Sequence, residues 1–147
     1  MNLSVYFVTP DGADDALILA ALRGGAGVVQ LRDKQATDAE MLAQALRIKP
    51  LVAAAGALLV INDRLDVALA CGADGLHIGQ GDGDPRLARA ALGPDRLLGL
   101  SIETEAQLAL MPRGCVDYIG AGPVRATATK PDHASPMGFD GLARVVA

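Results

Sequence analysis

Residues 57–78 read ALLVINDRLDVALACGADGLHI and contain one complete strand–helix–strand unit. Residues 57–61 are apolar at every position, which is typical of a parallel strand buried on both faces. Residues 66–70 then predict a short helix, and residues 75–78 predict the next strand. Strands that alternate with helices in this way predict a parallel sheet with crossover helices.

The same alternation extends along the chain in both directions. We predict further strands at residues 5–9, 27–31, 97–100 and 117–120. We predict helices at residues 14–22, from Thr37, at 66–70, from Asp84, at 105–110 and at 139–146. Six strand–helix units without an internal linker indicate one domain over residues 1–147. They are compatible with an open doubly wound sheet and with a (β/α)8 barrel, and both architectures place their sites after the carboxyl ends of the strands.

Three of the helices carry more specific signals. Thr37 to Glu40 has the form of a capping box, and the helix that it opens has one apolar face, made of Met41, Ala45, Ile48 and Val52. Pro50 is expected to kink or interrupt this helix. Asp84 and Pro85 resemble an N-cap followed by proline in the first helical position, with Leu87, Ala88 and Ala91 expected to face inward.

The composition excludes several classes of protein. Apolar residues make up 51% of the chain and charged residues 20%, which argues against disorder. The net charge of −4 and the 3% aromatic content argue against a nucleic-acid surface. No apolar run approaches the roughly 20 residues of a membrane helix, and the first residues lack the basic region of a signal peptide. Cys71 and Cys115 lie outside any metal-type spacing and are expected to be small thiols. We therefore expect a cytoplasmic protein without nucleic-acid or membrane partners.

Two cations follow the strand at residues 27–31. Arg32 and Lys34 are two residues apart in an extended segment, so their side chains point the same way. An arginine that chelates two oxygens, beside the point charge of a lysine, suits a diphosphate. The alternative is a solvated strand end in which Arg32 pairs with Asp33 or with a helix.

Carboxylates follow the next two strands. Asn62 and Asp63 either cap the helix that comes after them or offer an amide and a carboxylate to a ligand and a hard cation. Asp82 or Asp84 supplies a possible second carboxylate for the same ion, although turn chemistry explains most of this segment. His77, inside the preceding strand, is expected to be a packed, hydrogen-bonded residue.

Hydroxyl groups follow the last two strands. Ser101 is either a ligand-binding hydroxyl or a cap for the segment after it. Residues 120–136, GAGPVRATATKPDHASP, combine small residues with Thr127, Thr129 and Lys130, which suit phosphate oxygens. The alternative is an ordinary surface loop. Cations, carboxylates, an amide and hydroxyls at one end of the sheet form the inventory of a magnesium diphosphate site. The sequence shows no Ser-His-Asp or Cys-His nucleophile set, no zinc spacing and no P-loop.

Four segments, in this order and spacing, closely resemble the thiamine-phosphate synthases. They are VVQLRDK (28–34), LLVINDRLDVALACGADGLHIGQGD (58–82), GLS (99–101) and DYIGAGPVRATATKPD (117–132). The resemblance implies a (β/α)8 barrel, also called a TIM barrel. It implies an enzyme that joins 4-amino-2-methyl-5-hydroxymethylpyrimidine diphosphate to a thiazole phosphate and releases diphosphate and thiamine phosphate. Carbon–oxygen cleavage would leave a pyrimidine methyl cation for the thiazole nitrogen to capture, so no protein nucleophile is needed.

The resemblance also implies the roles of individual residues. The pyrimidine diphosphate would be held by the segment Gln30, Leu31, Arg32, Asp33 and Lys34, and by Asn62 and Ser101. Asp63 and Asp82 would hold Mg²⁺. Thr127, Ala128 and Thr129 would take the thiazole phosphate, and Lys130 the diphosphate. Arg32, Lys34, Ser101 and Lys130 would act in catalysis.

The chain departs from the family pattern in three places. Gly81 stands where the family commonly has Glu. Glu103 stands where the family often has His, and the absence of this His disfavours a sibling thiazole tautomerase. The third departure is that six units stand where the family has eight. We therefore expect a C-terminally truncated barrel without the backbone amides that complete the thiazole phosphate site. Its first and sixth strands would be open edges that favour a homo-oligomer. The alternative function is a form that only binds the pyrimidine diphosphate with Mg²⁺.

Overall fold

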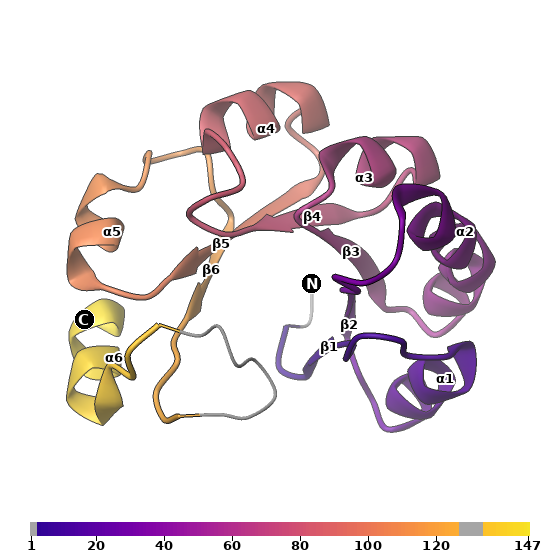
Figure 1. The fold of residues 1–147 in the computed structure, drawn as a ribbon, viewed down its shortest axis with the longest axis horizontal. Helices are drawn as coiled ribbons and strands as arrows, with labels where there is room; N and C mark the ends of the chain where they lie inside the picture. Colours follow the sequence, from indigo (N-terminus) through magenta and orange to yellow (C-terminus); the bar gives the residue numbers. More distant parts are fainter. Residues whose placement is uncertain (1–2, 127–133) are drawn as a thin grey trace.

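The computed structural model describes residues 3–126 and 134–147, which form six parallel strands, each followed by a helix (Figure 1). The strands are β1 (Tyr6–Val8), β2 (Val28–Leu31), β3 (Leu58–Asn62), β4 (Gly75–Ile78), β5 (Leu97–Ile102) and β6 (Tyr118–Ala121). The helices are α1 (Asp15–Arg23), α2 (Asp38–Ala54), α3 (Leu65–Cys71), α4 (Pro85–Leu92), α5 (Glu105–Leu110) and α6 (Gly138–Val146). Each predicted strand and helix is present, which confirms the alternation.

The order of the strands decides between the two architectures. They pair in sequence from β1 to β6, whereas a doubly wound sheet reverses its strand order. The helices lie on the outer side of the curved sheet, so that the strands line the inside of an open arc (Figure 1). In the described residues β1 and β6 each pair with one neighbour and form the two edges. The fold is therefore a half-barrel of the TIM-barrel type.

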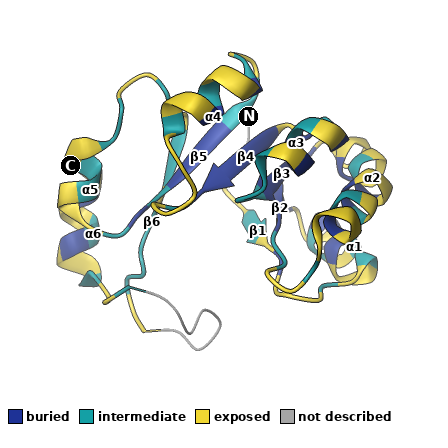
Figure 2. Cartoon of the chain, turned by 45° about the horizontal axis from the view of Figure 1, so that its top comes forward, coloured by how far each residue is buried: buried dark blue, intermediate teal, exposed yellow. Residues whose placement is uncertain are grey.

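The hydrophobic core lies between the sheet and the helices. Alternate residues of the strands, such as Leu31, Ile61 and Leu100, face the helices and pack against residues that include Met41 and Ile48. The middle strands and the inner sides of the helices are buried, while the outer sides of the helices are exposed (Figure 2). The other set of strand residues faces the inside of the arc, because side chains alternate between the two faces of a strand.

The sequence signals predicted the starts of helices α2 and α4 correctly, but not the effect of Pro50 or the buried face of α4. Both halves of the capping box at Thr37 form, and the four predicted apolar positions of α2 are its buried residues. Helix α2 nevertheless runs through Pro50, so no interruption occurs. Pro50 is exposed, and the buried Val52 beyond it keeps the last turn packed on the sheet.

Asp84 caps α4 as predicted, but the face of α4 that packs on the core differs from the prediction. Ala88 and Leu92, one turn apart, are buried, whereas Leu87 and Ala91 are exposed. The helices of residues 3–126 and 134–147 are all too short or too polar for a bilayer crossing.

Candidate active site

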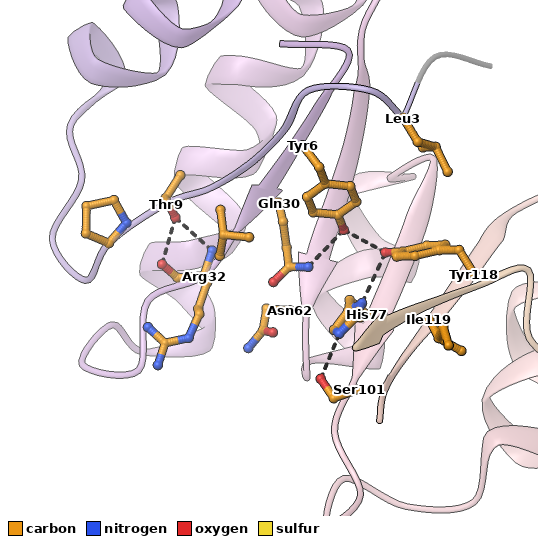
Figure 3. A pocket seen from close by; sticks show the side chains of 13 residues that line it. Leu3, Tyr6, Thr9, Gln30, Arg32, Asn62, His77, Ser101, Tyr118 and Ile119 are labelled. Atoms are coloured by element: carbon orange, nitrogen blue, oxygen red, sulfur yellow. Dashed lines mark hydrogen bonds between the residues drawn. The ribbon is translucent and has the colours of Figure 1, made fainter. Parts of the chain in front are cut away.

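A cavity of about 730 Å³ opens on the inner face of the sheet, and it reaches the carboxyl ends of the strands (Figure 3). Its polar lining comes from Tyr6, Thr9, Gln30, Arg32, Asn62, His77, Ser101 and Tyr118. Leu3, Val8, Pro10, Ile119 and Gly120 complete the wall. A concave cavity in which polar groups converge between apolar side chains is the usual form of a small-molecule site.

Four of the predicted substrate-binding residues line this cavity. Gln30, Asn62 and Ser101 belong to strands β2, β3 and β5, and Arg32 follows β2 directly. They meet because every second residue of a strand faces the inside of the arc. Leu31, between Gln30 and Arg32, therefore faces outward and is buried in the hydrophobic core. Its side chain does not line the cavity, so only its backbone is available to a ligand there.

The guanidinium group of Arg32 is held by Asp11, a residue outside the site predicted from the sequence. Arg32 Nη1 lies 2.9 Å from Asp11 Oδ1, and the same oxygen accepts a hydrogen bond from the Lys34 backbone N–H at 3.0 Å. The predicted alternative, a pairing of Arg32 with Asp33, was wrong. Thr9 is also outside the predicted site, yet it supports the backbone of Arg32. Its hydroxyl accepts from the Arg32 N–H at 2.9 Å and donates to the Arg32 carbonyl oxygen at 2.7 Å.

The carboxylate of Asp33 orders the loop after β2. It accepts hydrogen bonds from the backbone N–H groups of Gly12, Gln35 and Ala36 at 2.9, 2.9 and 3.1 Å. Burial raises the pKa of Asp33, but these hydrogen bonds outweigh it and leave the pKa below its ordinary value. Asp33 therefore connects the loop after β1 to the loop that carries Lys34.

The side chains of Asp63 and Asp82, the carboxylate pair that the family resemblance implies, meet after β3 and β4. Burial first, and then the hydrogen bond and charge of Asp82, raise the pKa of Asp63 to about 6. A hydrogen bond with Asn62, and then the charge of Lys34, oppose the rise. Asp63 also adopts a left-handed backbone, with φ of 61°, which is uncommon outside glycine. Strained backbone of this kind is concentrated at functional sites.

A helix-capping role was the alternative for the polar residues after β3 and β4, and only the one after β4 has it. Arg64 is the N-cap of α3, so neither Asn62 nor Asp63 caps that helix. Asp84 does cap α4, through a hydrogen bond from the Arg86 N–H at 2.8 Å. Asp82 accepts from the Gly79 N–H at 2.6 Å and is the carboxylate beside Asp63.

The carboxylate pair suits a hard divalent cation. No group of three or more His, Cys, Asp or Glu side chains with metal-binding geometry is found in residues 3–126 and 134–147. Mg²⁺ typically takes one or two protein carboxylates and fills its other positions with water and substrate phosphates. Asp63 and Asp82 therefore fit a Mg²⁺ ion that binds together with a phosphorylated ligand.

A chain of hydrogen bonds crosses the cavity from one edge of the sheet to the other (Figure 3). Gln30 Nε2 bonds Tyr6 Oη at 2.8 Å, and Tyr6 Oη lies 2.6 Å from Tyr118 Oη. His77 then links Tyr118, 3.2 Å from its Nδ1, to Ser101 Oγ, 2.9 Å from its Nε2. The prediction that His77 is a packed, hydrogen-bonded residue is confirmed. Tyr6 and Tyr118 were missed, although an aromatic ring with a polar tip inside an apolar strand is a usable signal.

Four predicted residues cannot be placed relative to this cavity. Thr127, Ala128, Thr129 and Lys130 lie outside the described residues.

Comparison with known proteins adds to this geometry. The sequence model of the family described as thiamine monophosphate synthase matches residues 5–147. The chain belongs to this family. A thiamine-phosphate synthase of Solidesulfovibrio magneticus is 54% identical over 127 residues, which are 86% of this chain and 60% of that protein. A thiamine-phosphate synthase of Chloroflexus aurantiacus is 46% identical over 143 residues, which are 94% of this chain and 66% of the relative.

A solved structure supports the same membership of the thiamine monophosphate synthase family. The thiamine phosphate pyrophosphorylase of Pyrococcus furiosus superposes with a TM-score of 0.86 at 30% identity, over 98% of this chain and 69% of that one. The chain thus spans about two thirds of the length of these relatives.

Proposed function

We propose that this chain carries the pyrimidine-diphosphate site of a thiamine-phosphate synthase. The protein would condense 4-amino-2-methyl-5-hydroxymethylpyrimidine diphosphate with a thiazole phosphate, and would release diphosphate and thiamine phosphate. One observation carries the proposal: Gln30, Arg32, Asn62 and Ser101 line a single cavity at the strand ends. The relatives from Solidesulfovibrio magneticus and Chloroflexus aurantiacus, which match 86% and 94% of this chain, are thiamine-phosphate synthases. Their names favour the synthase over a tautomerase.

The proposed chemistry divides the site into a charged part and a neutral part. Arg32 would chelate diphosphate oxygens in place of Asp11, and Lys34 would add a second positive charge. Gln30, Asn62 and Ser101 would orient the pyrimidine by hydrogen bonds. Val8 and Ile119 would exclude water from the carbocation that forms when the carbon–oxygen bond breaks. Held by Asp63 and Asp82, Mg²⁺ would neutralise the charge of the leaving diphosphate.

The proposal also extends to the segment after β6. Thr127 and Thr129, with Ala128 between them, would bind the thiazole phosphate, and Lys130 would bind the diphosphate. Their residue types support these roles, because hydroxyls and an ammonium group are suitable donors to phosphate oxygens.

The test is an assay of the full-length protein with both substrates and Mg²⁺, followed by chromatography for thiamine phosphate. We expect Mg²⁺-dependent product and its loss in Asp63→Ala. Asp95→Ala is the matched control, because Asp95 is an exposed carboxylate before β5, at the amino end of the sheet. Absence of product at every Mg²⁺ concentration would refute the synthase proposal. Calorimetry with the pyrimidine diphosphate alone then tests the binding site separately.

A further inference from the structure

The hydrogen-bonded chain across the cavity has a direction that follows from its first member. The Gln30 Nε2 amide group has only protons to offer, and it donates to Tyr6 Oη. Tyr6 must then direct its own proton elsewhere. Tyr118 Oη, at 2.6 Å, is the acceptor that the described residues provide for it.

The next two hydrogen bonds follow in the same direction. Tyr118 Oη, which receives the Tyr6 proton, can pass its own proton to His77 Nδ1 at 3.2 Å. A neutral imidazole that accepts at Nδ1 carries its proton on Nε2. Nε2 therefore donates to Ser101 Oγ at 2.9 Å. The Ser101 hydroxyl, already an acceptor from His77, is left to donate its proton into the cavity that it lines.

The reverse direction is unfavourable. If His77 Nδ1 donated to Tyr118, and Tyr118 to Tyr6, the Tyr6 oxygen would accept two hydrogen bonds. Its own proton would then find no recorded acceptor among the described residues. The half-buried Tyr6 hydroxyl would then have only cavity water as an acceptor, so this direction gives up one hydrogen bond within the protein. Burial raises the pKa of both tyrosines, so both hydroxyls keep their protons.

The backbone is shaped to hold the central pair of this chain. Gly99 in β5 lies directly beside His77 in β4 and Tyr118 in β6. A Cβ atom at Gly99 would overlap the Tyr118 ring and His77 Nδ1. The two rings approach each other with their centroids 5.6 Å apart, so glycine is required for the Tyr118–His77 contact.

We propose that Tyr118 is a positioning residue that acts through His77. Its hydroxyl holds His77 in the Nε2–H tautomer, and this tautomer presents Ser101 as a hydrogen-bond donor to an acceptor atom of the ligand. The inference rests on the proposed function, in which Ser101 contacts the pyrimidine diphosphate. It adds a role for a residue that itself need not form a hydrogen bond with the substrate.

The experiment uses Tyr118→Phe, which removes the hydroxyl and keeps the ring. The sequence has two histidines, so ¹⁵N NMR of the labelled side chains reports the His77 tautomer, assigned by loss of its signals in His77→Gln. We expect the Nε2–H tautomer in the wild type and a mixture of tautomers in Tyr118→Phe. Tyr6→Phe tests the direction of the chain, because it removes the donor that turns the Tyr118 proton toward His77. We expect this variant to give a mixture of tautomers as well.

Calorimetry with the pyrimidine diphosphate and Mg²⁺ supplies the second readout. Loss of one directed hydrogen bond should weaken binding to Tyr118→Phe roughly 3- to 10-fold. In a Ser101→Ala background the same substitution should add less than about twofold, since coupled residues are not additive. An unchanged tautomer, or an equal loss of affinity in both backgrounds, would overturn the inference. A wild-type protein that binds no pyrimidine diphosphate would overturn the proposed function as well.

Discussion

At the scale of single residues, Asp63 lies where its charge is disfavoured. Burial and the neighbouring Asp82 raise its pKa to about 6, whereas a carboxyl in an unfolded chain titrates near ~3.9. The folded protein therefore binds this proton more tightly than the unfolded chain. The contribution of Asp63 to the free energy of unfolding is full below about pH 4 and is lost as the pH rises through about 6.

Asp63→Asn should remove this pH dependence, because an amide does not ionise and asparagine tolerates a left-handed backbone. Relative to wild type, we expect a gain of about 1 kcal/mol between about pH 4 and about pH 7.5, allowing for solvent screening. Urea unfolding at both pH values measures it. Asp84→Asn removes the same charge from a nearby turn and keeps a capping side chain, so it should follow the wild-type profile. Parallel profiles for Asp63→Asn and wild type would contradict the prediction.

Gly99 offers a second test at the residue scale. Gly99→Ala would force Tyr118 and His77 apart, and overpacking of this kind costs about 1–3 kcal/mol. We expect that loss in the free energy of unfolding, together with weaker binding of the pyrimidine diphosphate. Gly81→Ala is the control, since a Cβ there meets no atom within 4 Å, and its stability should change by less than about 0.5 kcal/mol. Equal stabilities for the two variants would show that the contact is not tight.

At the scale of elements, the hydroxyl of Thr9 helps to join the carboxyl ends of β1 and β2. Thr9 is buried and bonds both the N–H and the carbonyl oxygen of Arg32. Thr9→Val keeps the shape of the side chain but leaves these backbone groups without their partner, which should cost about 1–3 kcal/mol. Because Arg32 would lose its support, affinity for the pyrimidine diphosphate should fall too. Calorimetry and urea unfolding measure both effects, and Thr9→Ser, which keeps the hydroxyl, should restore them. Failure of serine to restore affinity would locate the defect in packing instead.

The elements themselves were largely predictable. The apolar positions of α2 repeat with the helical period, and the capping signals at Thr37 and Asp84 act within a few residues, so both can be recognised locally. The exposed positions of Leu87 and Ala91 could not be recognised in this way. In a helix of eight residues, small differences in how it docks decide which side is buried.

At the scale of the whole molecule, one hydrophobic cluster extends from Ile18 in α1 to Val145 in α6. We expect this continuous core to unfold in a single transition, as predicted for one domain. Coincident transitions in circular dichroism and in tyrosine fluorescence would confirm it. Two separated transitions would show that the chain contains more than one folding unit.

Ligand binding should stabilise the whole molecule, because the site joins residues from several strands. At a free concentration of pyrimidine diphosphate about 100 times its Kd, the folded state gains about 2.7 kcal/mol. Thermal unfolding with Mg²⁺ should show this as a higher Tm, and a chelator should reverse most of the shift. Inorganic phosphate at the same concentration serves as the comparison ligand. A shift that persists in the chelator would argue against the role of Asp63 and Asp82 as metal ligands.

The sequence by itself determined the alternation of strands and helices, and it placed Arg32, Asn62, Asp63, Asp82 and Ser101 at strand ends. These features depend on local periodicity and on backbone hydrogen bonding, which neighbouring residues encode. Only the tertiary structure decided which distant groups meet. Tyr6 and Tyr118 are 112 residues apart, and their hydroxyls touch because the sheet curves and brings its two edges to one cavity. Asp11 reaches Arg32 for a different reason: they follow β1 and β2, and neighbouring parallel strands end side by side.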